Sequence, residues 1–385
     1  MTARLLTVAL VLLACAAPTL ALDDAHWRKA DAAAERAIEY LRKSQNEDGS
    51  WTPKPGPAIT ALVIAAMLDR PDIGPDDPTV KKGLDYILTF VKPDGGIHGG
   101  MLENYNTSIC LSALSRVNTR PDIAEAVANA QNYLRNLQWA GQQGPDGKTV
   151  DESHPYYGGA GYGNSGRPDL SNTQFMLQAL YDSGLDCNDP AFQRAVVFIS
   201  RLQGIPSNTE YGDKIVQDGG FIYTTSVDKE RVGVPQSMAS PEMTDEAKAG
   251  RPVSGLRTYG SVTYSAFKSL VYANLDREDE RVKAVHNWVR RNYTMEQNPG
   301  MPEPMKLQGL YYYYMTMARA MRAWGASTID TIPGGQRDWA NDLIAALVER
   351  QNEDGSWVNA ADRWMEADPN LVTAYALTAL NAATR

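Results

Sequence analysis

The sequence predicts an all-α protein: a single α/α toroid (an α6/α6 barrel) built from about six helix-pair repeats. Three observations support this fold class. An apolar helical segment recurs six times, each copy follows a more amphipathic helical segment, and a Gly-rich turn joins the two segments of a pair. The first and last turns also share the sequence Gln-Asn-Glu-Asp-Gly-Ser-Trp, at 45–51 and 351–357.

The apolar segments are expected to form the inner ring of helices. They are apolar on nearly every side, which is typical of helices buried all round. Small residues beside the closing Leu or Met allow close packing between neighbouring helices, and most copies begin at a Thr. The aligned stretches are 60–67, 107–114, 173–180, 263–270, 314–321 and 373–380.

The segments that precede them are expected to form the outer ring. Each carries charged residues on one side and Ile, Leu, Tyr or Trp on the other, as a helix does when it covers an apolar layer. The predicted outer helices are 30–43, 81–91, 125–137, 191–202, 279–291 and 339–350.

The repeated turn indicates how the helix pairs begin and end. Its Gly allows the positive φ of a helix stop, while Gln and Asp can bond loose backbone groups and the Trp can fold back onto the helix ends. An open solenoid needs atypical polar repeats at its ends. Here the terminal repeats carry the strongest consensus, so we expect them to meet and close the ring. Weaker copies of the turn are 94–96 and 218–221.

Residues 1–21 are expected to be a signal peptide, followed by the toroid over 25–385. Arg4 precedes an apolar run, 5–14, that is too short for a stable membrane anchor. Two processing patterns compete. Small residues at 19–21 fit simple cleavage. The sequence Leu-Leu-Ala-Cys ending at Cys15 instead resembles a bacterial lipobox, in which a lipid on Cys15 would anchor the protein to a membrane. Either pattern predicts export to the periplasm or the exterior.

Composition excludes some classes of function. The 385 residues are 43% hydrophobic and 22% charged, as in ordinary globular proteins, and the net charge of -9 argues against a nucleic-acid partner. After the predicted signal peptide only Cys110 and Cys187 remain, which do not make a disulfide framework. Whether these two pair, and how many copies of the chain associate, the sequence leaves open.

A Gln-x-x-x-Gly-x-Trp turn repeated between helix pairs resembles the squalene–hopene cyclase and protein prenyltransferase superfamily of terpenoid enzymes. The resemblance covers roughly 25–385. It implies an α/α toroid with an aromatic-lined central cavity for isoprenoid chains. The turn motif indicates the fold and does not specify a reaction.

The cyclases of this superfamily carry Asp-x-Asp-Asp-Thr just before an inner helix, and its middle Asp protonates the substrate. The best match here runs from Asp169 to Thr173, with Ser171 at the middle position and Asn172 after it. A serine hydroxyl is far too weak an acid to protonate an alkene. Asp169 therefore stays a candidate catalytic residue, Ser171 and Asn172 are candidate cavity residues, and the usual initiation step is not expected.

The prenyltransferases bind zinc through Asp-x-Cys and a distant His. Asp186 directly precedes Cys187, which is the wrong spacing, and zinc needs three or four converging ligands. We expect no metal site and no cofactor. The His residues lie far apart in the sequence, at His26, His98, His154 and His286.

The Gly-rich loop before Asp169 concentrates chemically useful residues. Gly lets the backbone approach a ligand closely, and His154 is a second candidate catalytic residue. The alternative is a long turn in which Asp169 or Ser171 caps the next helix. Residues 161–166 read Gly-x-Gly-x-x-Gly, but no strand precedes them, so they do not indicate a nucleotide site. The candidate cavity residues of this loop are Tyr156, Tyr157, Tyr162 and Arg167.

The starts of other inner helices add further aromatic candidates. Successive helix residues turn by about 100°, so one or two of the four tyrosines at 311–314 are expected to face the cavity. The alternative is aromatic core packing. The long insertion 224–256 is either a lid or a surface loop. The remaining candidate cavity residues are Glu103, Tyr105, Tyr259, Tyr264, Tyr311 and Tyr314.

Three functions are compatible with these patterns. The first is an exported cavity protein that binds or processes a hydrophobic isoprenoid- or triterpenoid-like ligand, without the usual catalytic acid or zinc. The second is a secreted lyase-like enzyme that processes polysaccharides, for which tyrosine, His154, Arg167 and Asp169 would supply the base, the acid and the clamp for a substrate carboxylate. The third is a non-catalytic binding module. The sequence does not decide whether the protein is an enzyme.

Overall fold

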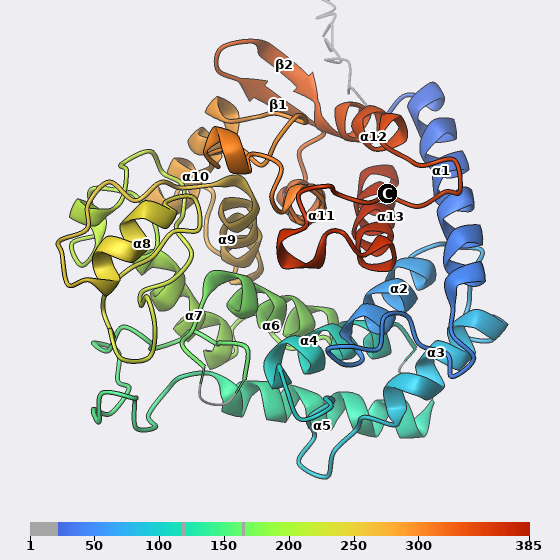
Figure 1. Cartoon of the computed structure of the whole chain (residues 1–385), viewed down its shortest axis with the longest axis horizontal. Coiled ribbons are helices and arrows are strands. Elements are labelled where there is room, and N and C mark those ends of the chain that lie inside the picture. Colours follow the sequence, from blue (N-terminus) through green and yellow to red (C-terminus); the bar gives the residue numbers. More distant parts are fainter. Residues whose placement is uncertain (1–21, 118–119, 164–165) are drawn as a thin grey trace, which may run out of the picture.

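The computed structural model describes residues 22–117, 120–163 and 166–385, and over these residues the chain is an all-α toroid. Figure 1 shows an inner ring of helices enclosed by an outer ring. The predicted fold class is therefore confirmed. The inner helices are α2 (Ala58–Leu68), α4 (Glu103–Leu114), α6 (Leu170–Asp182), α9 (Gly260–Tyr272), α11 (Leu310–Trp324) and α13 (Pro369–Thr384).

Each inner helix follows an outer helix in the chain. The inner helices are buried over most of their length, whereas the outer helices bury one side only. The outer helices are α1 (Asp24–Ser44), α3 (Pro78–Leu88), α5 (Pro121–Leu137), α7 (Pro190–Arg201), α10 (Glu280–Arg291) and α12 (Trp339–Glu349).

The smaller elements lie in the connections. A short helix, α8 (Pro241–Lys248), belongs to the insertion 224–256 and lies at the periphery beside α7 and α9 in Figure 1. Strands β1 (Thr328–Thr331) and β2 (Gly335–Asp338) form an antiparallel hairpin before α12. The 3-10 helices are η1 (Ser115–Val117), η2 (Gly212–Lys214), η3 (Glu303–Met305) and η4 (Arg363–Met365).

The ring is closed, as the matching terminal repeats predict. Helix α13 packs against both α11 and α2, and the outer helix α1 packs against α12. The predicted signal peptide, 1–21 with Cys15, lies outside the described residues, so that prediction stays untested. Within the described ranges, no helix is both long and apolar enough to cross a membrane. Cys110 and Cys187 are both free.

A repeated glutamine joins four of the turns to the next outer helix. The side-chain amide of Gln45 donates to the Gly49 carbonyl in its own turn and to the Thr79 carbonyl in α3, both at 3.0 Å. Gln351 makes the equivalent bond to Ala33 in α1, at 2.9 Å. The last turn is thereby bonded to the first outer helix. The same bridge recurs from Gln138 to Ala191 and from Gln203 to Arg281.

The repeated threonine holds the end of the turn against the inner helix. The backbone N–H of Trp51 donates to the Thr60 hydroxyl at 3.0 Å, and the Trp51 indole N–H donates to the Leu41 carbonyl at 2.8 Å. Satisfying these buried groups explains why Thr recurs at this position. Equivalent hydroxyls accept a turn N–H at Thr107, Thr173, Thr263 and Thr373.

Candidate functional site

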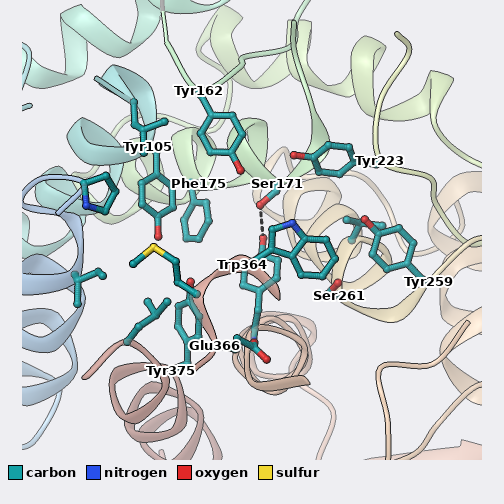
Figure 2. Close-up of a pocket in the computed structure, with 17 residues that line it drawn as sticks. Tyr105, Tyr162, Ser171, Phe175, Tyr223, Tyr259, Ser261, Trp364, Glu366 and Tyr375 are labelled. Atoms are coloured by element: carbon teal, nitrogen blue, oxygen red, sulfur yellow. Dashed lines mark hydrogen bonds between the residues drawn. The ribbon is translucent and has the colours of Figure 1, made fainter. Parts of the chain in front are cut away.

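A cavity of about 240 Å³ opens at one end of the ring, among the first turns of the inner helices. Figure 2 shows the side chains that surround it. Eight of its lining side chains are aromatic, six of them tyrosines with a hydroxyl group, and the other polar side chains are two serines and one glutamate. The aromatic and polar lining residues are Tyr105, Tyr162, Ser171, Phe175, Tyr223, Tyr259, Ser261, Tyr312, Trp364, Glu366 and Tyr375.

The helical repeat explains which residues face this cavity. When the inner helices are aligned on the recurring Thr, the residue two positions earlier lines the cavity in five of the six. This position lies in the first helical turn and points toward the ring axis. In the fifth inner helix Tyr314 takes the place of the Thr, so the residue two earlier is Tyr312. The five lining residues at this position are Tyr105, Ser171, Ser261, Tyr312 and Leu371.

The Tyr312 hydroxyl is the centre of a small polar floor. It lies 2.9 Å from the Ser171 hydroxyl and 3.4 Å from the Ser265 hydroxyl, and it accepts a bond from the Gln174 amide at 3.0 Å. Ser265 donates its own proton to the Ser261 carbonyl. When Tyr312 donates to Ser171, the Ser171 O–H is left to donate to a ligand oxygen.

Lys268 holds the Gln174 side chain in the orientation that donates to Tyr312. Its ammonium nitrogen is 2.7 Å from both the Gln174 and the Gln178 side-chain oxygens, and the residue is 1% exposed. With its oxygen bonded to Lys268, the Gln174 amide presents its NH₂ group to Tyr312. Burial, followed by the nearby charge of Arg319, lowers the pKa of Lys268 well below its ordinary value.

Glu366 supplies the charged group of the cavity wall. It is 1% exposed, and its two carboxylate oxygens accept from the Tyr312 backbone N–H at 2.8 Å and from the Asn359 amide at 2.6 Å. The Tyr312 bond places Glu366 at the N-terminus of α11, where a negative charge is favoured. Burial outweighs these bonds and raises the pKa of Glu366 to about 7.

Asp169, a candidate catalytic residue, caps helix α6 and is not among the residues that line the cavity. Its carboxylate accepts from the backbone N–H and the side-chain amide of Asn172, both at 2.8 Å. Burial raises the pKa of Asp169 to about 6. Ser171, two residues later, does line the cavity.

Trp364 and Met365 lie over the mouth of the cavity. Both have positive φ, 59° and 66°, which is uncommon for residues other than glycine. In this conformation the side chains of Trp364 and Met365 are 40% and 42% exposed, and both still contribute to the lining. The described insertion 224–256, for which a lid was one of the two predictions, contributes no residue to the cavity lining. The residues at the mouth come from η4 instead.

The structure brings four of the predicted cavity residues together around this space. Tyr105 and Ser171 come from the first turns of α4 and α6, Tyr259 directly precedes α9, and Tyr162 comes from the Gly-rich loop. Phe175 links two of the helices, since its ring packs edge-on against Tyr105, with 5.4 Å between ring centroids.

The start of the Gly-rich loop lies elsewhere. His154 is buried and 3.1 Å from the Asp146 carboxylate, and its ring packs against Tyr156. Tyr156 belongs to a small separate apolar cluster with Trp139. The members of that cluster are Trp139, Val150 and Tyr156, with Tyr157 packed against them.

Six further predicted residues surround the cavity lining without being part of it. Arg167 bonds the Gln236 side chain and lies behind Tyr223, with its guanidinium 5.7 Å from the ring centroid. Asn172 pairs with Asp169, and Glu103 is half-buried at the start of α4. The tyrosines Tyr264, Tyr311 and Tyr314 are buried in the core.

Several lining residues were not among the sequence candidates. The aligned repeat could have identified Tyr312, and also Phe175 and Tyr375, which both lie two residues after the recurring Thr. Trp364 and Glu366 lie in a connection without a repeat signal. Over the described residues, no group of three or more His, Cys, Asp or Glu is placed to hold a metal ion.

Solved structures with the same fold act on different substrates. A D-mannose isomerase matches with a TM-score of 0.55 and 12% identity over 92% of this chain and 97% of the other. A family 76 glycoside hydrolase from a bovine Bacteroides thetaiotaomicron strain matches with a TM-score of 0.54 and 12% identity, over 91% of this chain and 77% of the other. These two likenesses show the α/α-toroid fold.

A type II terpene cyclase from Scytonema is more distant, with a TM-score of 0.38 and 12% identity over 94% of this chain and 99% of the other. No protein-family model matches the sequence, and the comparison with curated proteins gives no match.

Proposed function

We propose that the cavity binds a hydrophobic small molecule of the isoprenoid or triterpenoid kind. The observation that carries this proposal is the lining itself, in which eight aromatic side chains surround the space and Glu366 is the one charged residue. The other polar groups are two serine hydroxyls and the hydroxyls of the six tyrosines among the aromatic residues. Largely apolar pockets with a few placed polar groups are typical small-molecule sites. The hydroxyl pair of Ser171 and Tyr312 would orient one oxygen of such a ligand.

The proposal is for binding, with or without a reaction. Ser171 occupies the position of the cyclase acid, and a serine cannot do that chemistry. Glu366 lines the cavity and has a raised pKa, so it is the group best placed for proton transfer if a reaction occurs. A loss of turnover without loss of binding in Glu366→Gln would assign that role.

The proposal is tested by extracting the purified protein with organic solvent and identifying the extract by mass spectrometry. We expect an apolar molecule in a fixed ratio to protein, or saturable binding when an isoprenoid alcohol is offered. A protein that carries no such molecule and binds none would contradict the proposal.

Carbohydrate is the second candidate ligand. Aromatic faces also stack against sugar rings, and Asp169 and Glu366 are two buried acids with raised pKa values near the cavity. A glycosidase needs both acids to flank the scissile bond. Asp169 lies outside the lining, which favours the hydrophobic ligand. Release of reducing sugar from mannan by the protein, abolished in Asp169→Asn, would instead support the carbohydrate enzyme.

Export stays part of the proposal. The signal-peptide pattern in 1–21 supports it, with simple cleavage after Ala21 and lipidation of Cys15 as the two routes. Mass spectrometry of the mature N-terminus separates them. A chain that begins at Leu22 indicates cleavage, a lipid-modified Cys15 indicates anchoring, and an intact Met1 in the cell interior would contradict export.

A further inference from the structure

We infer that the ligand of this cavity carries a positive charge on its apolar body, and that Glu366 binds this charge among the aromatic rings. The inference rests on the proposed function, because it names the chemical class of ligand for the same cavity. The class is a substituted ammonium compound whose remaining groups are hydrophobic.

Among the residues that the structure describes, Glu366 has no positively charged partner. Among the 17 lining residues it alone has a carboxylate, and none of them is Lys, Arg or His. Its two hydrogen bonds come from neutral donors, the Tyr312 backbone and the Asn359 amide. In the described part of the chain, no basic side chain lies within 4.0 Å of it. A buried carboxylate without a counter-ion is costly, and a bound cation would remove that cost.

The aromatic rings would bind the same charge. A cation within about 6 Å of a ring centroid is attracted to the face of the ring, and substituted ammonium groups are recognised in this way. Two of the eight rings already carry a guanidinium, since Arg167 lies 5.7 Å from the Tyr223 centroid and Arg363 lies 5.2 Å from that of Trp364. Other rings have no such partner in the described residues, among them Tyr105, Phe175, Tyr259, Tyr312 and Tyr375.

An uncharged ligand would neither pair with the Glu366 carboxylate nor make cation–π contacts with the faces of the aromatic rings. It could bond the hydroxyl pair of Ser171 and Tyr312, but it would cover Glu366 without pairing its charge. The rings themselves add no charge near neutral pH, since burial raises the pKa of Tyr312 to about 12. Glu366 and Ser171 both line the cavity and lie within the same group of side chains in Figure 2, so one ligand could contact both.

The test uses two probes of the same shape. Phenyltrimethylammonium carries a permanent positive charge, and tert-butylbenzene replaces its nitrogen with carbon. Equilibrium dissociation constants for both are measured on the full chain at pH 8 by displacement of an apolar fluorescent probe. We expect the cation to bind about ten-fold more tightly or better, because its charge pairs with the Glu366 carboxylate, which is mostly ionised at pH 8.

Glu366→Gln should remove most of that preference and leave the affinity for tert-butylbenzene within about two-fold. The matched control is Glu303→Gln, which removes an exposed charge (81% exposed side chain) from the loop before α11 and should keep the preference. Equal affinity of the native protein for both probes would overturn the inference and leave the hydrophobic cavity standing, even if Glu366→Gln fails to fold. A preference that survives in Glu366→Gln would also overturn it. If neither probe binds, the proposed function itself fails.

Discussion

The backbone N–H of Tyr312 donates to the Glu366 carboxylate at 2.8 Å, while the Tyr312 hydroxyl lies 2.9 Å from Ser171. One residue thus joins the charged group of the cavity wall to the hydroxyl pair of its floor. Because the N–H belongs to the first turn of α11, Glu366 is held by the end of an inner helix. The position of the charge is therefore fixed by the ring, although Glu366 itself lies in a connection.

Glu366 makes stability depend on pH in the acid range. Its pKa is about 7 in the folded protein against 4.5 for the ordinary residue, so the folded state retains a proton that the unfolded state loses between these values. The stabilisation from this group is complete below pH 4.5 and is lost as the pH rises through 7. Relative to Glu366→Gln, native stability should fall by about 3 kcal/mol between pH 4.5 and pH 8.

Urea unfolding of both proteins at several pH values from 4.5 to 8 measures this difference. Glu303→Gln serves as the control and should follow the native curve, because Glu303 is exposed. If the free energies of unfolding of the native protein and Glu366→Gln differ by the same amount over the whole pH range, burial does not raise the pKa of Glu366.

Lys268 should give the opposite slope in the alkaline range. Its folded pKa is well below 10.5 because of burial, so the unfolded state binds a proton that the folded state lacks. Stability relative to Lys268→Met should therefore rise with pH, by at most about 1.4 kcal/mol per pH unit, until the pH approaches 10.5. Urea unfolding between pH 7.5 and 9.5 measures the slope.

Lys283→Met removes an exposed lysine from α10 and is the control, for which no comparable slope is expected. If the free energies of unfolding of the native protein and Lys268→Met differ by the same amount at every pH, Lys268 stays charged in the folded protein. In that case the orientation assigned to the Gln174 amide would still hold, since both forms of the lysine can donate to its oxygen.

Gln351 closes the ring, so its removal should weaken the whole fold. Gln351→Leu keeps the volume but leaves the Ala33 and Gly355 carbonyls without their donor. A hydrogen bond within a protein contributes about 0.5–1.5 kcal/mol, so the loss of these two part-buried bonds should cost about 1–3 kcal/mol in urea unfolding. Gln336→Leu, on the exposed hairpin strand, should change stability by less than about 0.5 kcal/mol. An unaffected Gln351→Leu would mean that the helices close the ring without this bridge.

The fold was predictable because its signal is local and repeated. Apolar helices, Gly turns and the matched ends at Trp51 and Trp357 each report on short stretches, and the closed ring follows from their repetition. The cavity was predictable only in part. A run of four tyrosines does not show which of them faces the cavity, and the prediction named Tyr311 and Tyr314. Alignment of the helix on the recurring Thr would have selected Tyr312, which lines the cavity.

The rest of the site depends on tertiary contacts that no local pattern encodes. Glu366 reaches the cavity because its loop folds over the N-terminus of α11, and Trp364 does so through a positive φ that its residue type does not favour. His154 shows the converse. Its Gly-rich loop has the composition of a ligand site, yet its own partner, Asp146, holds it in a separate cluster.

The central claim is that the cavity binds a hydrophobic molecule, and isothermal titration with an isoprenoid alcohol tests it most directly. Leu371→Trp fills the lining from α13, and Val358→Trp adds the same side chain at an exposed position. We predict saturable 1:1 binding to the native protein and to Val358→Trp, weakened about ten-fold or more in a folded Leu371→Trp. No saturable binding to the native protein, or equal affinity in Leu371→Trp, would contradict the claim.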